Sequence, residues 1–576
     1  MTRMIKFLQP FRLTVVAVVL LVFGQAMADL QLPTLMARII DTGVVKSDTD
    51  YIWRTGGVMM LVAAGSAIAA IIASFLSALV ASGFGRNLRS RVFRQVTGYS
   101  LHEIDKLGTA TLITRTTNDI NQVQLVLLLI MRMMIYAPII AVGGILFALS
   151  EDAPLSVVIA VVVPILAIAI GIIAYFGVPL FRKLQTRIDN LNRVLREALT
   201  GIRVVRAFDR TAFEQERFAA ANDDLMQVAV KVNRIMALLF PVLMITMNLT
   251  SIAIIWFGGK RIDAGDMQVG SLMAFIQYVM QIMFALLMFS MLFVMVPRAQ
   301  ASADRINQVL DMVPEINDPP HPIRPEREHG HVEFRDVTFS YPGAVEPAVS
   351  HLSFTAEPGE FVAIIGGTGA GKSTLVNLIP RFYDVDSGSV LVDGVDVREM
   401  TQAELRGRIG FVPQQAILFT GTIADNIRYG KDDATDDEVR YAAEVSQCKE
   451  FINEMPDGFE SVIAQGGTNV SGGQKQRLSI ARALVRRPEV YVFDDSFSAL
   501  DFKTDARLRR ALKQETADAT VLIVAQRVAT VLDADKIIVL DDGQIVGIGT
   551  HRELMRTNEV YREIVSSQLS EEELAA

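Results

Sequence analysis

Residues 365–374 read Ile-Gly-Gly-Thr-Gly-Ala-Gly-Lys-Ser-Thr, and the segment from Gly366 to Ser373 fits the pattern G-x-x-x-x-G-K-[ST]. Apolar residues precede it, as in a buried strand, and helical spacing follows it, which argues against a chance glycine turn. Glycines let the backbone wrap tightly, so that N–H groups and a helix N-terminus face a phosphate chain. Lys372 would supply charge to the β and γ phosphates, and Ser373 an oxygen to Mg²⁺. The stretch predicts a nucleoside triphosphate site.

The composition indicates a membrane protein and argues against other classes. The chain has 576 residues, 51% of them hydrophobic, and the apolar runs concentrate in its first half. A formal net charge of −8 argues against a nucleic-acid-binding protein, which usually presents a basic face. One cysteine, Cys448, excludes an intrachain disulfide framework. The first apolar run continues too far for a cleavable signal peptide, and we expect none.

Six apolar segments approach or exceed the roughly 20 residues that a membrane helix needs. They lie near residues 13–40, 55–84, 124–150, 154–179, 234–258 and 270–297. Basic residues precede the first segment and follow the second and the fourth, as the positive-inside rule expects of cytoplasmic ends. Lys260 and Arg261 disagree weakly, because they fall in an outer loop. We predict a multi-pass protein of the inner (cytoplasmic) membrane, with both termini in the cytoplasm and the lipid bilayer as a partner.

Two charged excursions separate these segments, at residues 85–123 and 180–233. Both keep apolar residues at helical spacing, which favours membrane helices that project beyond the bilayer over solvated loops. Bends are expected near residues 108–110 and 209–212.

Polar and flexible side chains inside the apolar segments suggest a cavity without establishing one. Asp29 and Arg132 are expensive in a membrane, so they either pair, contact substrate or serve the structure. The sixth segment is rich in methionine and phenylalanine. Such a wall could accept hydrophobic small molecules, but lipid-facing and packing surface is the competing explanation.

The chain changes character after the sixth segment. Prolines and charges predict a linker at residues 311–330, between a membrane domain at 1–310 and an α/β domain at 331–576. Tyr341 follows alternating strand residues and could stack on an adenine ring. Gln414 ends an apolar strand, from which its amide oxygen could reach Mg²⁺ or water.

Two further motifs in the second half are more specific. Ser471-Gly472-Gly473-Gln474 precedes a helical pattern, and such a helix N-terminus forms a second anion-binding surface. An apolar strand ends at Asp494, whose carboxylate is suited to hold Mg²⁺, and Asp501 follows shortly after.

Together these motifs resemble those of ATP-binding-cassette (ABC) exporters: residues 331–565 resemble the nucleotide-binding domain and residues 1–330 the membrane domain, including Thr116–Asp119. The resemblance implies a six-helix α-helical transmembrane domain followed by an α/β P-loop ABC nucleotide-binding domain. It implies that two chains pair, with each ATP between one chain's phosphate loop and the other's residues 471–474. The bends near 108–112 and 209–214 would be coupling helices, the second docking on the partner's cassette.

The resemblance assigns ATP and Mg²⁺ to a defined set of residues. The expected nucleotide-binding residues are Tyr341, Gly366, Thr368, Gly369, Gly371, Lys372, Ser373, Thr374, Gln414, Ser471, Gly472, Gly473, Gln474, Asp494 and Asp501. The expected metal ligands among them are Ser373, Gln414 and Asp494.

The chain departs from the family at two catalytic positions. Asp495 stands where the family normally has glutamate, and the shorter side chain withdraws the carboxylate by over an ångström, a misplacement that can cost about a hundredfold in rate. Gln526 stands where the family has a histidine, and glutamine cannot become cationic. This resembles heterodimeric bacterial multidrug exporters, in which one ATP site is degenerate.

We therefore expect an ATPase-coupled transporter of hydrophobic or amphipathic small molecules, with a second half-transporter chain as partner. A homodimeric exporter or a lipid flippase is the alternative within the family. An ATP-gated channel or regulatory membrane protein is the alternative from another class.

Overall fold

The structure is a computed structural model that describes residues 2–326 and 329–568. The chain divides into two compact units. One holds Met1–Gln95 and Ala110–Met312, and the other holds Val96–Thr109 and Val313–Ala576. Residues 96–109 therefore pack with the C-terminal half of the chain, although both of their sequence neighbours belong to the membrane unit.

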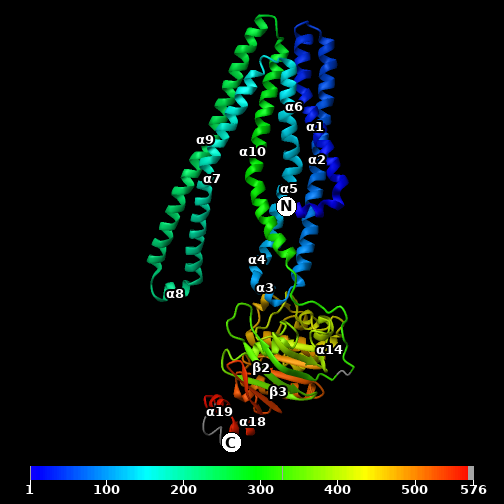
Figure 1. The fold of residues 1–576 in the computed structure, drawn as a ribbon, viewed down its shortest axis with the longest axis vertical. Coiled ribbons are helices and arrows are strands. Elements are labelled where there is room, and N and C mark those ends of the chain that lie inside the picture. Colours follow the sequence, from blue (N-terminus) through cyan, green and yellow to red (C-terminus); the bar gives the residue numbers. More distant parts are fainter. Residues whose placement is uncertain (1, 327–328, 569–576) are drawn as a thin grey trace. The chain divides into compact units, whose positions relative to one another are not determined.

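Within the described residues, six helices are long and apolar enough to cross a membrane, as the sequence predicts (Figure 1). The spans are Lys6–Val44, Thr49–Thr97, Thr109–Glu151, Val157–Thr200, Thr211–Asp263 and Val269–Asp311. The elements of this unit are η1 (Thr2–Phe11), α1 (Arg12–Arg38), η2 (Ile39–Val44), α2 (Thr49–Thr97), α4 (Thr109–Thr114), η3 (Arg115–Asp119), α5 (Ile120–Leu129), η4 (Ile130–Met134), α6 (Ile135–Glu151), α7 (Val157–Thr200), α8 (Ile202–Ala207), α9 (Thr211–Asp263) and α10 (Val269–Asp311).

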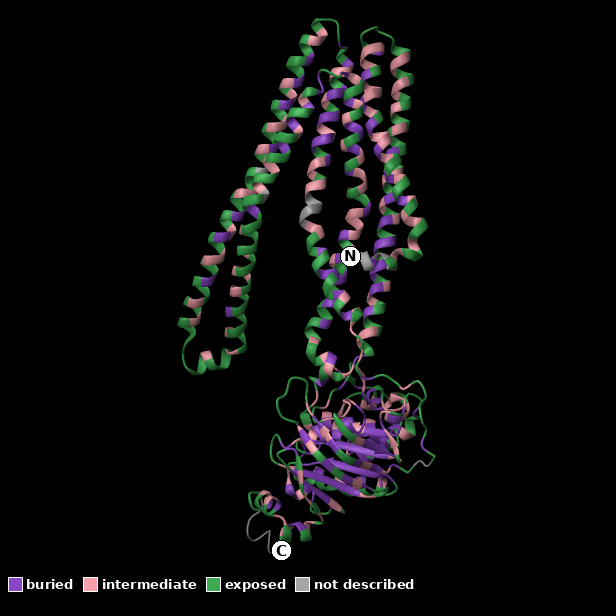
Figure 2. Cartoon of the chain, viewed as in Figure 1, coloured by how far each residue is buried: buried purple, intermediate pink, exposed green. Residues whose placement is uncertain are grey.

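Helices α1, α6 and α10 form the main packed core of the membrane unit. Leu30 of α1 and Phe275 and Tyr278 of α10 are fully buried there. Buried residues face one another between these helices, whereas most residues on the outer sides are exposed (Figure 2). Gly143 of α6 permits the close approach, because a Cβ there would lie 2.4 Å from Cδ1 of Leu30.

Helices α7 and α9 pack along each other as a hairpin with α8 at its tip (Figure 1). Charged pairs link α7 and α9. The guanidinium of Arg217 donates a hydrogen bond to the carboxylate of Glu197, and Nη1 of Arg187 lies 3.0 Å from Oδ2 of Asp224. The charged excursion at 180–233 is thus helical apart from short turns, as the sequence predicts. Asp209, with φ of 49°, turns the chain before α9 begins.

The other excursion contains the short helix α3 (Leu101–Leu107), which begins in a capping box between Ser100 and Glu103. Gly108, with φ of 73°, ends it. The short helices α3 and α8 lie just before the expected bends, and α4 and α9 begin at Thr109 and Thr211. The assignment of coupling helices near 108–112 and 209–214 stays a prediction.

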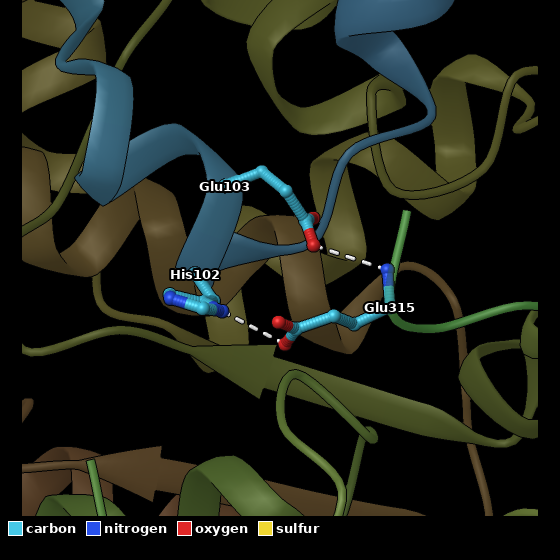
Figure 3. Close-up of side chains that lie close together, drawn as sticks. All are labelled: His102, Glu103 and Glu315. Atoms are coloured by element: carbon cyan, nitrogen blue, oxygen red, sulfur yellow. Dashed lines mark hydrogen bonds and ion pairs between the residues drawn. The ribbon is translucent and has the colours of Figure 1, made fainter. Parts of the chain in front are cut away.

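A bracket of three side chains fastens α3 to the linker that follows the membrane helices (Figure 3). Oε1 of Glu103 accepts a hydrogen bond from the backbone N–H of Glu315 at 3.0 Å, and Oε2 accepts from the N–H and the hydroxyl of Ser100 at 2.7 and 2.5 Å. Nδ1 of His102 lies 2.8 Å from Oε2 of Glu315. Their ligand atoms lie within 4.8 Å of one another, a spacing that a metal ion could use, but these bonds already engage them. We therefore interpret the cluster as a structural bracket.

The C-terminal half holds two larger sheets. One has six strands in the order β12-β11-β3-β10-β9-β6, parallel except for β12, and the other has four in the order β2-β1-β4-β5. The strands are β1 (Val332–Phe339), β2 (Val349–Ala356), β3 (Phe361–Gly366), β4 (Ser387–Val392), β5 (Val395–Asp396), β6 (Ile409–Val412), β7 (Gly421–Thr422), β8 (Val462–Ile463), β9 (Val490–Asp494), β10 (Thr520–Val524), β11 (Lys536–Asp541) and β12 (Gln544–Gly549).

The helices of this half are short compared with those of the membrane unit. They are α11 (Lys372–Leu378), α12 (Gln402–Gly407), α13 (Ile423–Arg428), α14 (Asp436–Val445), α15 (Lys449–Glu454), α16 (Gly472–Leu484), α17 (Phe502–Glu515), α18 (His551–Thr557) and α19 (Glu559–Ser566). The 3-10 turns η5, η6 and η7 lie at Gly458–Glu460, Gln465–Gly467 and Val528–Thr530.

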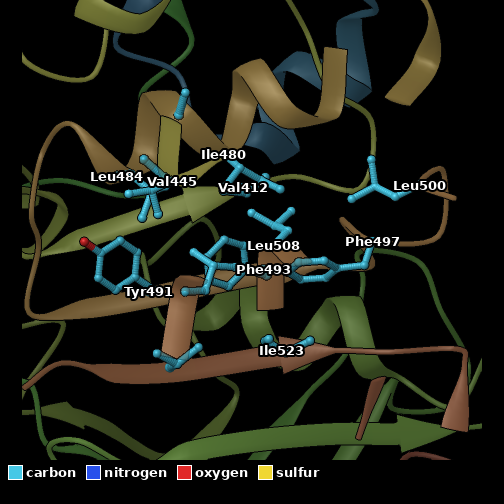
Figure 4. Close-up of a cluster of buried hydrophobic side chains, with 14 of the residues drawn as sticks. Val412, Val445, Ile480, Leu484, Tyr491, Phe493, Phe497, Leu500, Leu508 and Ile523 are labelled. Atoms are coloured by element: carbon cyan, nitrogen blue, oxygen red, sulfur yellow. The ribbon is translucent and has the colours of Figure 1, made fainter. Parts of the chain in front are cut away.

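Alternate residues of each central strand face opposite cores, as the two-residue period of a strand requires. Ile523 of β10 packs in the core that α14, α16 and α17 cover, together with Phe493 and Leu508 (Figure 4). Leu522 and Val524 pack on the other side, against α11 and the four-stranded sheet. Both faces are buried, which explains the nearly continuous apolar runs of these strands.

The bracket generates a stability prediction. Burial opposes ionisation of Glu103, but the hydrogen bonds from Ser100 and Glu315 prevail and lower its pKa. Because the pKa of Glu103 is lower in the folded state, the ionised side chain stabilises the fold at pH values above its unfolded-state pKa. This stabilisation is lost as the pH falls through its folded-state pKa. We expect Glu103→Ala to lower the free energy of unfolding at pH 7 by about 1–3 kcal/mol. Calorimetry of the full chain would measure this.

The matched control is Glu315→Ala, which keeps the backbone donor to Glu103 and removes only the partly exposed pair with His102. We expect it to cost less than about 1 kcal/mol. Equal costs for the two variants would contradict the bracket as described.

Candidate functional site

The loop between β3 and α11 has the backbone that the sequence motif predicts. Gly369 and Gly371 adopt φ of 87° and 91°. Glycine is favoured at Gly371 for two reasons: its φ is positive, and a Cβ there would lie 2.7 Å from the carbonyl oxygen of Ala348. Thr368 is exposed in the loop, and α11 begins at Lys372, directly after it.

Lys372 lies folded over the loop that precedes it. Its Nζ donates hydrogen bonds to the carbonyl oxygens of Gly366 and Gly367 at 2.9 and 2.6 Å. Burial lowers the pKa of Lys372, and the nearby charges of Asp495 and Asp494 oppose that shift. The ammonium is therefore poorly solvated and placed at the loop, where an anionic phosphate would stabilise it.

Ser373 and Asp494 offer a pair of oxygens at the ends of two different elements. Oγ of Ser373, on α11, donates to Oδ1 of Asp494, at the end of β9, with a distance of 2.8 Å. Burial raises the pKa of Asp494, since its charge is poorly solvated, and a cation beside it would favour the ionised form. Hydroxyl and carboxylate oxygens are the ligands that Mg²⁺ prefers, so these two residues fit that ion.

Asp495 and the two glutamines form one hydrogen-bonded cluster. Oδ2 of Asp495 accepts from Nε2 of Gln526 at 2.9 Å and from Nε2 of Gln414 at 3.4 Å. Burial raises the pKa of Asp495, and its φ of 45° is uncommon for a residue other than glycine. Gln414, expected as a metal ligand, thus directs its amide nitrogen to Asp495.

Tyr341 lies beside the helix that follows the phosphate loop. Its hydroxyl is 3.1 Å from Oγ1 of Thr374, and its ring packs edge-on against Tyr383 with centroids 5.4 Å apart. The ring remains partly exposed. Sequence reasoning missed Tyr383, which braces Tyr341, because no local pattern marks the contact.

Residues 471–474 form the N-terminus of α16. Oγ of Ser471 accepts from the N–H of Gln474 at 3.3 Å, and Oε1 of Gln474 accepts from the N–H of Ser471 at 2.8 Å. This capping box leaves Ser471 and Gly472 exposed, with Gly473 beside them partly buried. The two predicted phosphate-binding surfaces therefore lie on different elements, at the N-termini of α16 and α11.

Asp501 caps α17, where its Oδ1 accepts from the N–H of Thr504 at 2.9 Å. The turn before it is held by Arg527, whose guanidinium donates to the carbonyl oxygens of Ser498 and Leu500 at 2.9 and 3.3 Å. Sequence reasoning missed Arg527. The available signal was that Arg527 directly follows Gln526. In the fold, Arg527 links the segment after β10 to the turn after β9.

The structure thus brings one group of expected residues together and keeps another apart. Lys372, Ser373, Asp494, Asp495 and Gln526 meet at the carboxyl ends of β3, β9 and β10, the edge where parallel sheets bind ligands. Ser471–Gln474 lie outside this group.

Known proteins resemble both halves of the chain. Residues 15–286 match the family model of the ABC transporter transmembrane region, and residues 349–498 match that of the ABC transporter. An uncharacterized ABC transporter ATP-binding protein of Mycobacterium tuberculosis is 45% identical over 565 residues, which are 97% of each chain. A fatty acid ABC transporter ATP-binding/permease protein of Mycobacterium bovis is 36% identical over 82% of this chain and 75% of its own.

A solved structure extends the likeness to the whole fold. The chain superposes on a bacterial Atm1-family ABC exporter with ATP bound, with a TM-score of 0.80 and 26% identity, over 97% of this chain and 99% of the other. The chain therefore belongs to the ABC transporters, and it is an ATP-driven exporter half in which a six-helix membrane domain is fused to an ATP-binding domain.

Proposed function

We propose that this exporter half works in a heterodimer that moves hydrophobic or amphipathic small molecules across the cytoplasmic membrane. Its own ATP site binds nucleotide with Mg²⁺ and hydrolyses it weakly. Its intact Ser471–Gln474 surface completes the ATP site of the partner chain, which supplies the glutamate and the histidine that this chain lacks.

The hydrogen bonds around Asp495 carry the proposal. A carboxylate that polarises the attacking water needs a free oxygen directed at it. One oxygen of Asp495 already accepts from the amides of Gln526 and Gln414, and the aspartate is one methylene shorter than glutamate. An amide cannot be protonated to a cation as histidine can. Gln526 and Gln414 therefore hold Asp495 in place without supplying positive charge to a phosphate.

Binding groups are intact while hydrolytic groups are altered, which supports a site that retains ATP. The position of Lys372 at the loop and the oxygen pair of Ser373 and Asp494 support binding of phosphate and Mg²⁺. Ser471 and Gly472 are exposed at the start of a 13-residue helix, where a second chain's nucleotide can reach them. A chain whose Ser471–Gln474 surface is intact and whose own ATP site is weakened fits a heterodimer of two different chains.

Exposed aromatic residues support pairing through the hairpin as well. Phe208, at the tip beside α8, is 74% exposed, and on the cassette Phe419 and Tyr429 stack with ring centroids 4.6 Å apart yet remain largely exposed. Apolar surface of this kind at a helix tip and on a cassette suits contacts between two chains.

The proposal includes the orientation of the chain in the membrane and the limits of its domains. Residues 1–310 form the membrane domain, 311–330 the linker and 331–576 the ATP-binding domain, which lies with both termini in the cytoplasm of an inner (cytoplasmic) membrane. Flanking basic residues support this orientation. Helix α10 continues through Asp311, close to the proposed end of the membrane domain.

The cargo is argued from α10. Met273 and Phe284 are exposed, whereas Phe275 and Met283 pack in the core, so only part of the methionine- and phenylalanine-rich set is available to substrate. A lipid cargo is the second candidate, and the similarity to the fatty acid ABC transporter of Mycobacterium bovis favours it.

Restoring the two altered residues tests the weakened site. We expect Asp495→Glu combined with Gln526→His to raise ATP turnover at this chain's own site by about a hundredfold, because the carboxylate regains its reach and the switch residue can become cationic. Steady-state hydrolysis is measured on the complex purified from native membranes through a tag on this chain.

The control adds Lys372→Ala to the double variant, which removes phosphate binding at the same site. The gain should then vanish, which assigns it to this chain and not to the partner. Unchanged turnover in the double variant would mean that the catalytic water is held elsewhere.

Cross-linking distinguishes unlike from like pairs. In a Cys448→Ser background, Thr368→Cys and Ser471→Cys place thiols on both phosphate-binding surfaces of one chain. Two identical chains that sandwich ATP would be joined by a short bismaleimide, whereas a chain that needs an unlike partner should stay uncrosslinked when purified alone. Each single variant is the control, and an ATP-dependent covalent dimer would establish a homodimer.

A further inference from the structure

Asp29 lies where four membrane helices meet. It belongs to α1, and its carboxylate accepts hydrogen bonds from Oγ of Ser66 on α2 at 2.5 Å and from the hydroxyl of Tyr136 on α6 at 2.7 Å. Nε2 of Gln281, on α10, donates to the backbone oxygen of Asp29 at 3.4 Å. The site is therefore built from side chains of four separate helices of the membrane unit. Figure 1 shows these helices, α1, α2, α6 and α10.

The carboxylate has hydroxyl donors but no recorded cationic partner among the described residues. Arg132, the partner that the sequence offered, is exposed, and no ion pair between it and Asp29 is recorded. An ionised group in hydrocarbon is costly, and two hydroxyl hydrogen bonds stabilise the anion without neutralising its charge. The arrangement is thus complementary to a positive charge.

Gln281 provides an independent second observation. Its Oε1 is buried and accepts no recorded hydrogen bond from the described residues, although its amide nitrogen is anchored at Asp29. A buried acceptor without a donor costs free energy in a native structure. A ligand with an N–H donor would satisfy this oxygen.

We propose that Asp29 and Gln281 form the recognition site for the protonated amino group of an amphipathic substrate. The inference rests on the proposed export of amphipathic molecules and names their class. The ammonium pairs with the Asp29 carboxylate and donates to Oε1 of Gln281, while the apolar part of the molecule lies along the helices. Ser66 and Tyr136 are positioning residues that orient the carboxylate.

The same chemistry disfavours other cargo. The carboxylate of a fatty acid would be repelled by Asp29, and a quaternary ammonium has no N–H for Gln281. Asp29 is only partly buried.

Three probes that share one apolar scaffold test the inference: 4-phenylbutylamine, 4-phenylbutanol and 4-phenylbutyrate. Their binding to the full chain in lipid nanodiscs is measured by saturation-transfer NMR, with empty nanodiscs subtracted for partition into lipid. We expect the amine to bind about tenfold more tightly than the alcohol, as a charge-assisted contact provides, and the carboxylate least.

Asp29→Asn should abolish the preference for the amine over the alcohol. The matched control is Asp41→Asn, the same change in η2, where Oδ1 of Asp41 accepts from the N–H of Gly270 at 2.6 Å. It should preserve the preference. If Asp29→Asn does not fold, Ser66→Ala and Gln281→Leu test the site, and each should weaken amine binding several-fold.

An amine preference that survives in Asp29→Asn, or tighter binding of the carboxylate probe, would overturn the inference. The inference would also be overturned if position 29 cross-linked to a basic residue of a partner chain and that residue prevented binding of the amine. ATP-dependent uptake into inverted vesicles separates this inference from the proposed function. Uptake of all three probes alike would leave export standing and refute the site, whereas amine binding without uptake would do the reverse.

Discussion

The hydrogen bond from Ser373 to Asp494 joins residues 121 positions apart, and the whole ATP site depends on the strand order that makes it possible. Strands β3, β10 and β9 are adjacent and parallel, so their carboxyl ends meet at one edge. The phosphate loop follows the first of these strands, Gln526 follows the second, and Asp494 ends the third. Because all three strands are buried on both faces, this edge is rigid, and small changes in side-chain length there are felt directly.

Under the proposed function, that rigidity separates binding from hydrolysis within one site. The phosphate loop uses backbone groups and Lys372, which no departure affects. Asp495 instead depends on the reach of its side chain, and its φ of 45° is held by the surrounding structure, including the bond from its N–H to the carbonyl oxygen of Val524 at 3.1 Å. A backbone fixed in this way cannot move forward to compensate for a missing methylene.

Sequence reasoning succeeded where the signal is local and failed where a contact is distant. The six membrane spans and the strand–loop–helix around Gly366 follow from periodicity over neighbouring residues. The bracket from Glu103 to Glu315 spans 212 positions and has no periodic signature, although the capping box that begins at Ser100 was readable. Tyr383 and Arg527 were missed for the same reason, since each acts through a tertiary contact.

The membrane unit contains a contrast to Asp29. Arg261 donates to Asp152 at 2.8 Å, and the hydroxyl of Tyr278 donates to the carbonyl oxygen of Leu30 at 2.9 Å. Asp152 thus has a cation, whereas Asp29 has only neutral donors. Because ABC exporters must release their cargo, a site for a charged molecule cannot neutralise itself permanently. Hydroxyl donors do not neutralise a carboxylate, so under the proposal Asp29 can take up an ammonium and release it again when a conformational change weakens the contact.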